Sequence, residues 1–180
     1  MMSSLKLLLP IAWFTLVLLY APFTHAQHHE HASFGHLRVG LIISHTLIPT
    51  LVEGEKENLL IPSWGMDIEY WITPRWGIGL HNDIEIETFE VLSGDHEYIE
   101  RAYPLVFTLD AVWRPWRGLV LLAGPGVELE RNRNLQVMRM GAEYEIEFHQ
   151  GWDVTPNFFY DARSGAFDTW SLGLGVGKRF

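Results

Sequence analysis

The chain of 180 residues contains no cysteine, and its 13 lysines and arginines stand against 22 aspartates and glutamates. The absence of cysteine excludes disulfide bridges and thiolate metal sites. The sequence has no basic patch or stripe, which argues against nucleic acid as a partner. Beyond residue 26 no apolar run is long enough for a helix that spans a bilayer, so any membrane crossing has to use β-strands.

The amino-terminal segment predicts export. Lys6 gives a positively charged start, and the apolar run from Leu7 to Tyr20 has the length of a signal-peptide core. Thr24-His25-Ala26 then places small residues at the two positions that determine cleavage. A membrane-anchor helix is the alternative, but the run is short for a bilayer and contains Pro10. We therefore expect a cleavable signal peptide over residues 1–26.

The rest of the chain has the pattern of β-strands. Apolar and polar residues alternate through eight segments that glycine, proline and polar clusters separate; in the third, Leu80 and Ile84 share one face and His81 lies on the other. The expected strands cover residues 34–48, 60–73, 76–87, 103–114, 119–130, 138–148, 152–161 and 167–180. The pattern predicts an all-β fold, an eight-stranded antiparallel transmembrane β-barrel of up-and-down meander topology, as one domain over residues 34–180.

The two faces of these strands favour a membrane barrel over a soluble one. A soluble barrel or sandwich also alternates, but its apolar face points inward, where charged groups are costly. Here the polar faces are rich in carboxylates, which suits a polar interior. The apolar faces also end in two groups of aromatic residues, as the girdles of a transmembrane barrel do. One group is Trp76, Trp113, Trp116 and Trp152, and the other is Trp64, Tyr98, Tyr103, Tyr160 and Trp170.

The last strand carries the most specific resemblance. Its apolar face ends on Phe180, the final residue of the chain. This ending resembles the terminal signature of bacterial outer-membrane β-barrels, which the assembly machinery of that membrane reads. Together with the signal peptide and the eight segments, it makes the chain similar to the small eight-stranded barrels of the OmpA, OmpX, OmpW and PagL kind. The chain also resembles the uncharacterised porin-like proteins of the outer-membrane β-barrel domain family.

The resemblance implies an integral protein of the Gram-negative outer membrane. Its partners would be the outer-membrane lipid, lipopolysaccharide and the assembly machinery. An even number of strands places both termini on one side, which is the periplasmic side in this class. The connections over residues 50–58, 92–98, 131–134 and 162–166 would then face outward. We expect no cofactor.

The polar faces supply the main candidate site. The interior of an eight-stranded barrel is just wide enough for side chains to fill, so unpaired carboxylates there are costly. Two hypotheses follow: a closed interior with a hydrated polar network, in a structural or adhesion-type protein, or a narrow path or site that prefers cations. The residues expected to form it are Arg38, Asp67, Glu69, His81, Asp83, Glu85, Asp110, Glu128, Arg139 and Glu143.

Two further sites are open to a chemical interpretation. The start of the mature chain, a flexible periplasmic tail over residues 27–33, contains His28, His29 and His31, whose nitrogens suit Cu(II) or Ni(II). The PagL resemblance would imply a lipid A-modifying enzyme with a His and a Ser spaced one apart on the outward face. His45 has the outward parity, but its neighbour Ser44 does not. We therefore expect no catalytic residues and no enzyme.

Overall fold

The computed structural model describes residues 36–52, 55–92 and 98–180. Within these ranges the chain forms strands almost throughout, with one short 3-10 turn, η1 (His149–Gly151). The strands are β1 (Leu37–Val52), β2 (Glu55–Trp71), β3 (Trp76–Glu85), β4 (Thr88–Leu92), β5 (Tyr98–Ala102), β6 (Leu105–Trp116), β7 (Leu119–Leu129), β8 (Leu135–Tyr144), β9 (Ile146–Glu147), β10 (Trp152–Arg163) and β11 (Asp168–Arg179). In the part of the chain described, no helix is long and apolar enough to cross a membrane.

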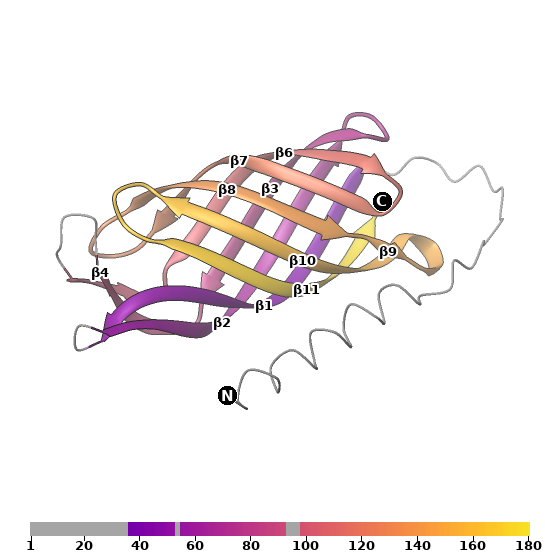
Figure 1. Cartoon of the computed structure of the whole chain (residues 1–180). Helices are drawn as coiled ribbons and strands as arrows, with labels where there is room; N and C mark the ends of the chain where they lie inside the picture. The colour runs from indigo at the N-terminus through magenta and orange to yellow at the C-terminus, as the bar shows by residue number, and fades with distance from the viewer. Residues whose placement is uncertain (1–35, 53–54, 93–97) are drawn as a thin grey trace, which may run out of the picture. The chain divides into compact units, whose positions relative to one another are not determined.

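Eight long strands close into a barrel (Figure 1). The order around it is β1, β2, β3, β6, β7, β8, β10 and β11, each antiparallel to the next, and β9 continues the edge of β8 against β10. Pairing of β1 with β11, from Arg38↔Arg179 to Leu47↔Trp170, closes the ring. Closure leaves none of the eight strands with an unpaired edge, which is what a strand-built membrane crossing requires. The predicted eight-stranded meander is confirmed.

The two ends of the barrel differ. At the short-turn end, tight connections join β2 to β3, β6 to β7 and β9 to β10, and β11 ends there (Figure 1). At the opposite end, here called the hairpin end, β1 and β2 pair out to Val52↔Glu55. The β4–β5 hairpin, paired from Thr88↔Ala102 to Leu92↔Tyr98, forms a separate small sheet at the same end.

The prediction of a loop over residues 50–58 is therefore wrong, and β3 ends at Glu85 instead of residue 87. The cause is the sequence of these segments, which is rich in glutamate and lacks an alternating apolar face. A hairpin that extends beyond an apolar band has water on its outer surfaces and needs no such face. Its sequence therefore looks like that of a loop, although the backbone pairing continues.

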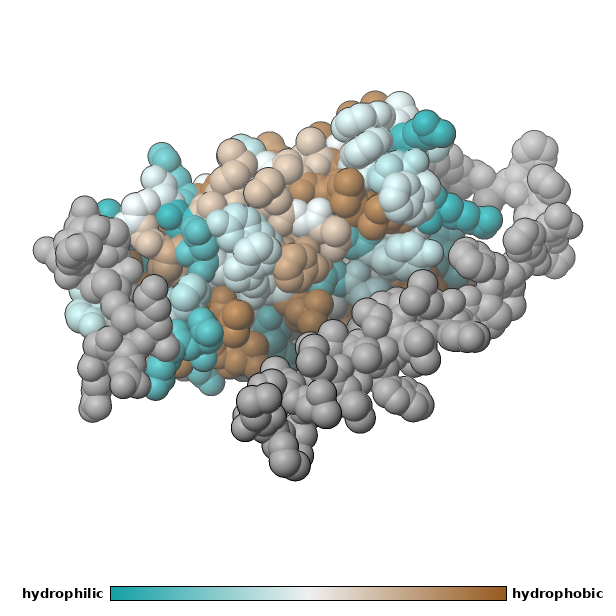
Figure 2. All heavy atoms as spheres, viewed as in Figure 1, coloured by the Kyte–Doolittle hydropathy of each residue, from teal (hydrophilic) through white to brown (hydrophobic). Residues whose placement is uncertain are grey.

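The distribution of side chains is the reverse of that in a soluble barrel. Outward residues such as Leu41 and Leu172 are each 66% exposed, whereas inward residues such as Glu69 and His81 are 0% exposed. Figure 2 shows apolar side chains across the middle of the visible face and hydrophilic ones toward the two ends. The aromatic residues predicted to form girdles are exposed, except Tyr160, which is half-buried, and Trp76 stacks on Trp113 with ring centroids 5.6 Å apart. This surface is suited to a bilayer.

Candidate functional site

The barrel interior contains the candidate site, and it is more evenly charged than the sequence indicated. Nine carboxylates are buried in the described part of the chain, together with His81 and four arginines. Sequence parity identified two of these arginines, Arg38 and Arg139. It missed Arg101, on β5, and Arg163, at the end of β10, because both lie outside the expected strands. Arg163 lies two residues after the inward Asp161, so continued alternation would have placed it on the inward face.

Near the short-turn end, Arg38 on β1 joins two carboxylates from different strands. Its guanidinium donates to Glu69 Oε1 at 2.6 Å and to both oxygens of Asp153, at 3.0 and 2.7 Å. A further bond reaches Thr155 Oγ1 at 2.8 Å. All four side chains are buried. These charge-assisted bonds connect β1, β2 and β10 through the interior.

A second group closes the short-turn end below Arg38. Glu145 accepts hydrogen bonds from Arg114 at 2.5 Å and from Arg179 at 2.9 and 3.0 Å. Both guanidinium groups lie over the buried ring of Trp71, with their central carbons 4.0 and 5.4 Å from the ring centroid. The indole N–H of Trp71 donates to Glu69 at 2.8 Å, so the two groups form one continuous network.

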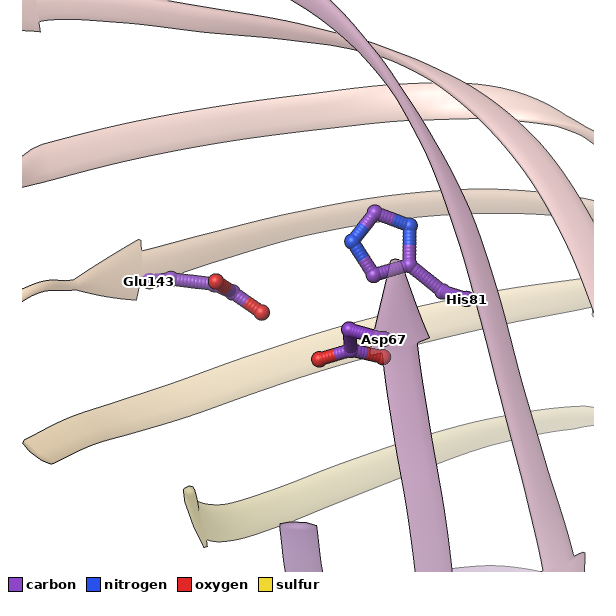
Figure 3. A group of neighbouring side chains, drawn as sticks. All are labelled: Asp67, His81 and Glu143. Carbon is purple, nitrogen blue, oxygen red and sulfur yellow. The ribbon is translucent and has the colours of Figure 1, made fainter. Parts of the chain in front are cut away.

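At mid-depth lies the central His81 group, formed by Asp67, His81, Asp110 and Glu143. His81 Nδ1 lies 2.7 Å from Asp110 Oδ2, and Thr108 Oγ1 donates to the same oxygen at 2.6 Å. One ligand atom from each of Asp67, His81 and Glu143 lies within 4.8 Å of the others. Figure 3 shows a ring nitrogen of His81 on the side that faces Glu143, with Asp67 below the ring. These three side chains are the ones that could hold a metal ion.

Arg139 forms the next layer toward the hairpin end. Its guanidinium donates to Asp161 at 2.7 and 2.6 Å and lies 2.6 Å from an oxygen of Asp83. Arg139 and Asp161 are direct cross-strand partners on β8 and β10. Asp83 comes from β3, so this layer also spans the interior.

The last charged layer joins Arg163 and Arg101 through Glu128, which forms short ion pairs with both. Arg163 also donates to Glu85 Oε1 at 3.2 Å, and Arg101 lies 3.4 Å from Glu130. Glu130 follows β7 and lies outside the spanning strands. Burial acts to raise its pKa, but the backbone N–H of Asn132 and the charge of Arg101 outweigh this and lower the pKa below its usual value.

Apolar side chains cap the interior at the hairpin end. The cluster is Ile48, Ile61, Phe89, Val91, Leu135 and Phe167, all buried. Phe89 and Phe167 pack edge to face, with centroids 6.2 Å apart. Thr50 Oγ1 on β1 donates to Glu90 O on β4 at 2.8 Å, which fixes the β4–β5 hairpin against β1.

The space beside Asp67 is small. A cavity of about 10 Å³ lies between Asp67, Asp83, Arg139 and Phe159. That volume is about the minimum that accommodates one water molecule. The interior is thus filled by side chains at the level of the central His81 group.

All ten residues predicted for the interior network lie on the inward face. Nine are buried, and Asp83 is half-buried. They do not form one continuous line of acids, because arginines separate them into layers. The tail histidines His28, His29 and His31 lie outside the described residues, as do the predicted signal peptide and the tail itself. Phe180 is exposed beside β1, and its backbone N–H donates to Leu37 O at 2.8 Å.

His45 points outward, as predicted, into an open groove between Leu60, Phe158 and Trp170. Its cross-strand neighbours are Pro62 on β2 and Leu172 on β11, and neither carries a hydroxyl. Asp168 accepts a hydrogen bond from the Tyr160 hydroxyl at 2.7 Å. The outward face therefore provides His45 with no serine partner from these neighbouring strands.

No protein-family model and no curated protein sequence matches the chain. Solved structures do match in fold. The attachment invasion locus protein Ail of Yersinia pestis, solved in complex with the heparin analogue sucrose octasulfate, aligns over 82% of this chain and 100% of its own, with 17% identity and a TM-score of 0.56. The amino-terminal β-barrel domain of Pseudomonas aeruginosa OprF aligns over 81% and 99%, with 16% identity and a TM-score of 0.53. Neisserial surface protein A aligns over 81% and 97%, with 8% identity and a TM-score of 0.51. The chain therefore has the fold of the small eight-stranded outer-membrane β-barrels.

Proposed function

We propose that this chain is an integral protein of the bacterial outer membrane, a structural or adhesion-type barrel with a closed interior. The apolar outer face and the fold support the membrane location. The lipid of the outer membrane, with lipopolysaccharide in its outer leaflet, would contact the apolar band, and the assembly machinery would recognise the strand that ends at Phe180.

The observation that carries the proposal is the series of buried side-chain layers that cross the interior. Layers centred on Arg38, Arg139 and Arg163 cross the barrel, and the cluster around Phe89 covers the hairpin end. A conducting path needs continuous space for a hydrated ion. The space found beside Asp67 is about 10 Å³. A closed interior would place contacts with large partner molecules on the outer surfaces.

The hairpin end is the proposed extracellular end. Outer-membrane barrels carry short turns on the periplasmic side and longer connections outside. The β1–β2 and β4–β5 hairpins lie at one end, and the short turns and the terminus of β11 lie at the other. Both chain ends are then periplasmic.

The described surface of the hairpin end does not favour a sulfated ligand like the one in the Ail structure. Glu57, Glu90 and Glu100 are exposed there, against the exposed Arg131 and Arg133. Together with these carboxylates, the overall net charge of −9 would repel a polyanion. An adhesion partner of neutral or basic character fits this end better.

The test is planar-bilayer conductance of the refolded protein, with folding verified by gel mobility and with a known porin as positive control. A closed interior predicts silence. Discrete steps that are cation-selective in a salt gradient, and that shrink when Glu85 and Asp110 are replaced by amides, would establish the cation-preferring pore instead. Lipid A mass spectrometry on cells that produce the protein or its His45→Ala variant separates the remaining alternative, because only an enzyme would alter lipid A in a way that depends on His45.

A further inference from the structure

The central His81 group differs from every other charged layer that the structure describes. Each of the others has an arginine within hydrogen-bond distance of its carboxylates. In the central group the nearest guanidinium to Glu143 is that of Arg38, at 3.8 Å. The carboxyl groups of Asp67, Asp110 and Glu143 thus surround a single histidine.

Several atoms of this group are buried without a hydrogen-bond partner. They are both carboxylate oxygens of Glu143, Nε2 of His81 and Oδ1 of Asp110. The side chains of Glu143 and His81 are 0% exposed, so bulk water does not reach them. A buried carboxylate without a partner is costly, and its oxygens and the free ring nitrogen lie on facing sides of one space (Figure 3).

We propose that Asp67, His81 and Glu143 bind one divalent transition-metal ion of the zinc type. One imidazole nitrogen and two carboxylates form a mixed nitrogen and oxygen donor set, which such ions accept and which Mg²⁺ and Ca²⁺ do not prefer. Two carboxylates balance the charge of one divalent ion. The interior position is compatible with a closed barrel, so the site does not depend on whether the protein conducts.

The distances allow a metal ion after a modest contraction. The three ligand atoms lie within 4.8 Å of one another. In a tetrahedral zinc site with bonds of about 2.1 Å, ligand atoms are about 3.4 Å apart. The side chains therefore have to close by up to about 1.4 Å, which rotation of Asp67 and Glu143 can supply.

The surroundings of His81 have the arrangement of a metal ligand. Metal-bound histidines usually donate their second ring N–H to a carboxylate, which fixes the tautomer and the orientation of the ring. Here Asp110 accepts from Nδ1 at 2.7 Å, and Thr108 holds Asp110 in turn. The lone pair of Nε2 is then directed into the group. Asp110 acts as a positioning residue, because it reaches the ion only through His81.

Because the interior is closed, the ion has to bind while the barrel folds. The test therefore refolds the full protein from denaturant with ZnCl₂, removes loose metal with a chelator after folding, and counts zinc by mass spectrometry. The variant His28→Ala/His29→Ala/His31→Ala serves as the parent, because the tail could bind zinc by itself. We expect about one zinc ion per chain in this parent. A parent that folds and retains no zinc overturns the proposal without any further variant.

Variants locate the site. Glu143→Gln and Asp67→Asn should lose the retained zinc, while Glu85→Gln, a buried carboxylate that pairs with Arg163, should keep it. Asp110→Asn should weaken binding by about 10- to 100-fold, as loss of such a supporting carboxylate does. Zinc-edge X-ray absorption should show one nitrogen ligand among oxygens. Equal retention by the Glu143→Gln variant, or equal uptake of Mg²⁺ in place of zinc, would sink the assignment.

Discussion

The layer around Arg139 gives the sharpest test of the buried network, through the substitution Arg139→Met. The guanidinium is bonded to Asp161 at 2.7 and 2.6 Å and lies 2.6 Å from Asp83. Methionine keeps much of the volume but leaves two carboxylates facing each other in the interior. Removal of one partner from a buried ion pair costs about 3–5 kcal/mol, because the remaining charge has no compensation.

The expected loss is large enough to measure by urea unfolding from lipid vesicles, followed by tryptophan fluorescence. With a loss of about 4 kcal/mol and a denaturant slope of roughly 2 kcal/mol per molar, the midpoint should fall by about 2 M. Arg139→Lys should fall between the parent and Arg139→Met. A lysine keeps the charge but cannot bond two carboxylates as a planar fork does.

The matched control removes all three charges, as Asp83→Asn/Arg139→Met/Asp161→Asn. If the penalty comes from uncompensated carboxylates, this triple variant should recover most of the lost stability. If Arg139→Met leaves the midpoint unchanged, the two carboxylates do not depend on the arginine and the network argument is refuted. If the triple variant is as unstable as Arg139→Met, the cause is lost packing instead of charge.

Two further substitutions test the packing around the charged layers. Gly79→Ala should destabilise the barrel by about 1–3 kcal/mol, because the added Cβ would lie 2.4 Å from Cε1 of His81; Gly40→Ala, whose Cβ would be 3.6 Å from the nearest atom, should be mild in the same urea assay. Phe167→Ala should cost about 3–5 kcal/mol, since it removes the edge-to-face partner of Phe89 from the apolar cap, and an unchanged urea midpoint would show that the cap does not stabilise the fold.

The fold could be predicted from the sequence because a strand has a period of two and a membrane barrel reverses the usual faces. The alternation alone predicts that Leu80 faces outward and His81 inward. Both predictions are confirmed, because Leu80 is exposed and His81 is buried. The hairpin end could not be predicted in the same way. Outside the apolar band nothing enforces alternation, so the extension of β1 and β2 to Val52 and Glu55 left no periodic signal.

The balance of interior charge could not be predicted either, because it depends on residues outside the apolar band. Arg101 and Arg163 lie where the strands leave the band, and without them the interior carboxylates of Glu85 and Glu128 appeared to lack partners. If Glu85 had no partner, its replacement by the amide in Glu85→Gln would stabilise the protein. With Arg163 at 3.2 Å from Glu85, the expected effect of the amide is a loss of stability.

The central His81 group can be predicted from the sequence only in part. Asp67 and His81 are direct cross-strand partners, and the short connection between β2 and β3 sets that register, so their proximity can be inferred from the sequence. Glu143 is different, because β8 lies four strands from β2 around the barrel. Which residue of a distant strand lies at the depth of Asp67 depends on strand tilt and on the stagger accumulated around the ring. No local pattern encodes that stagger, and so a site that joins opposite walls of a small barrel can be identified only once the ring is closed.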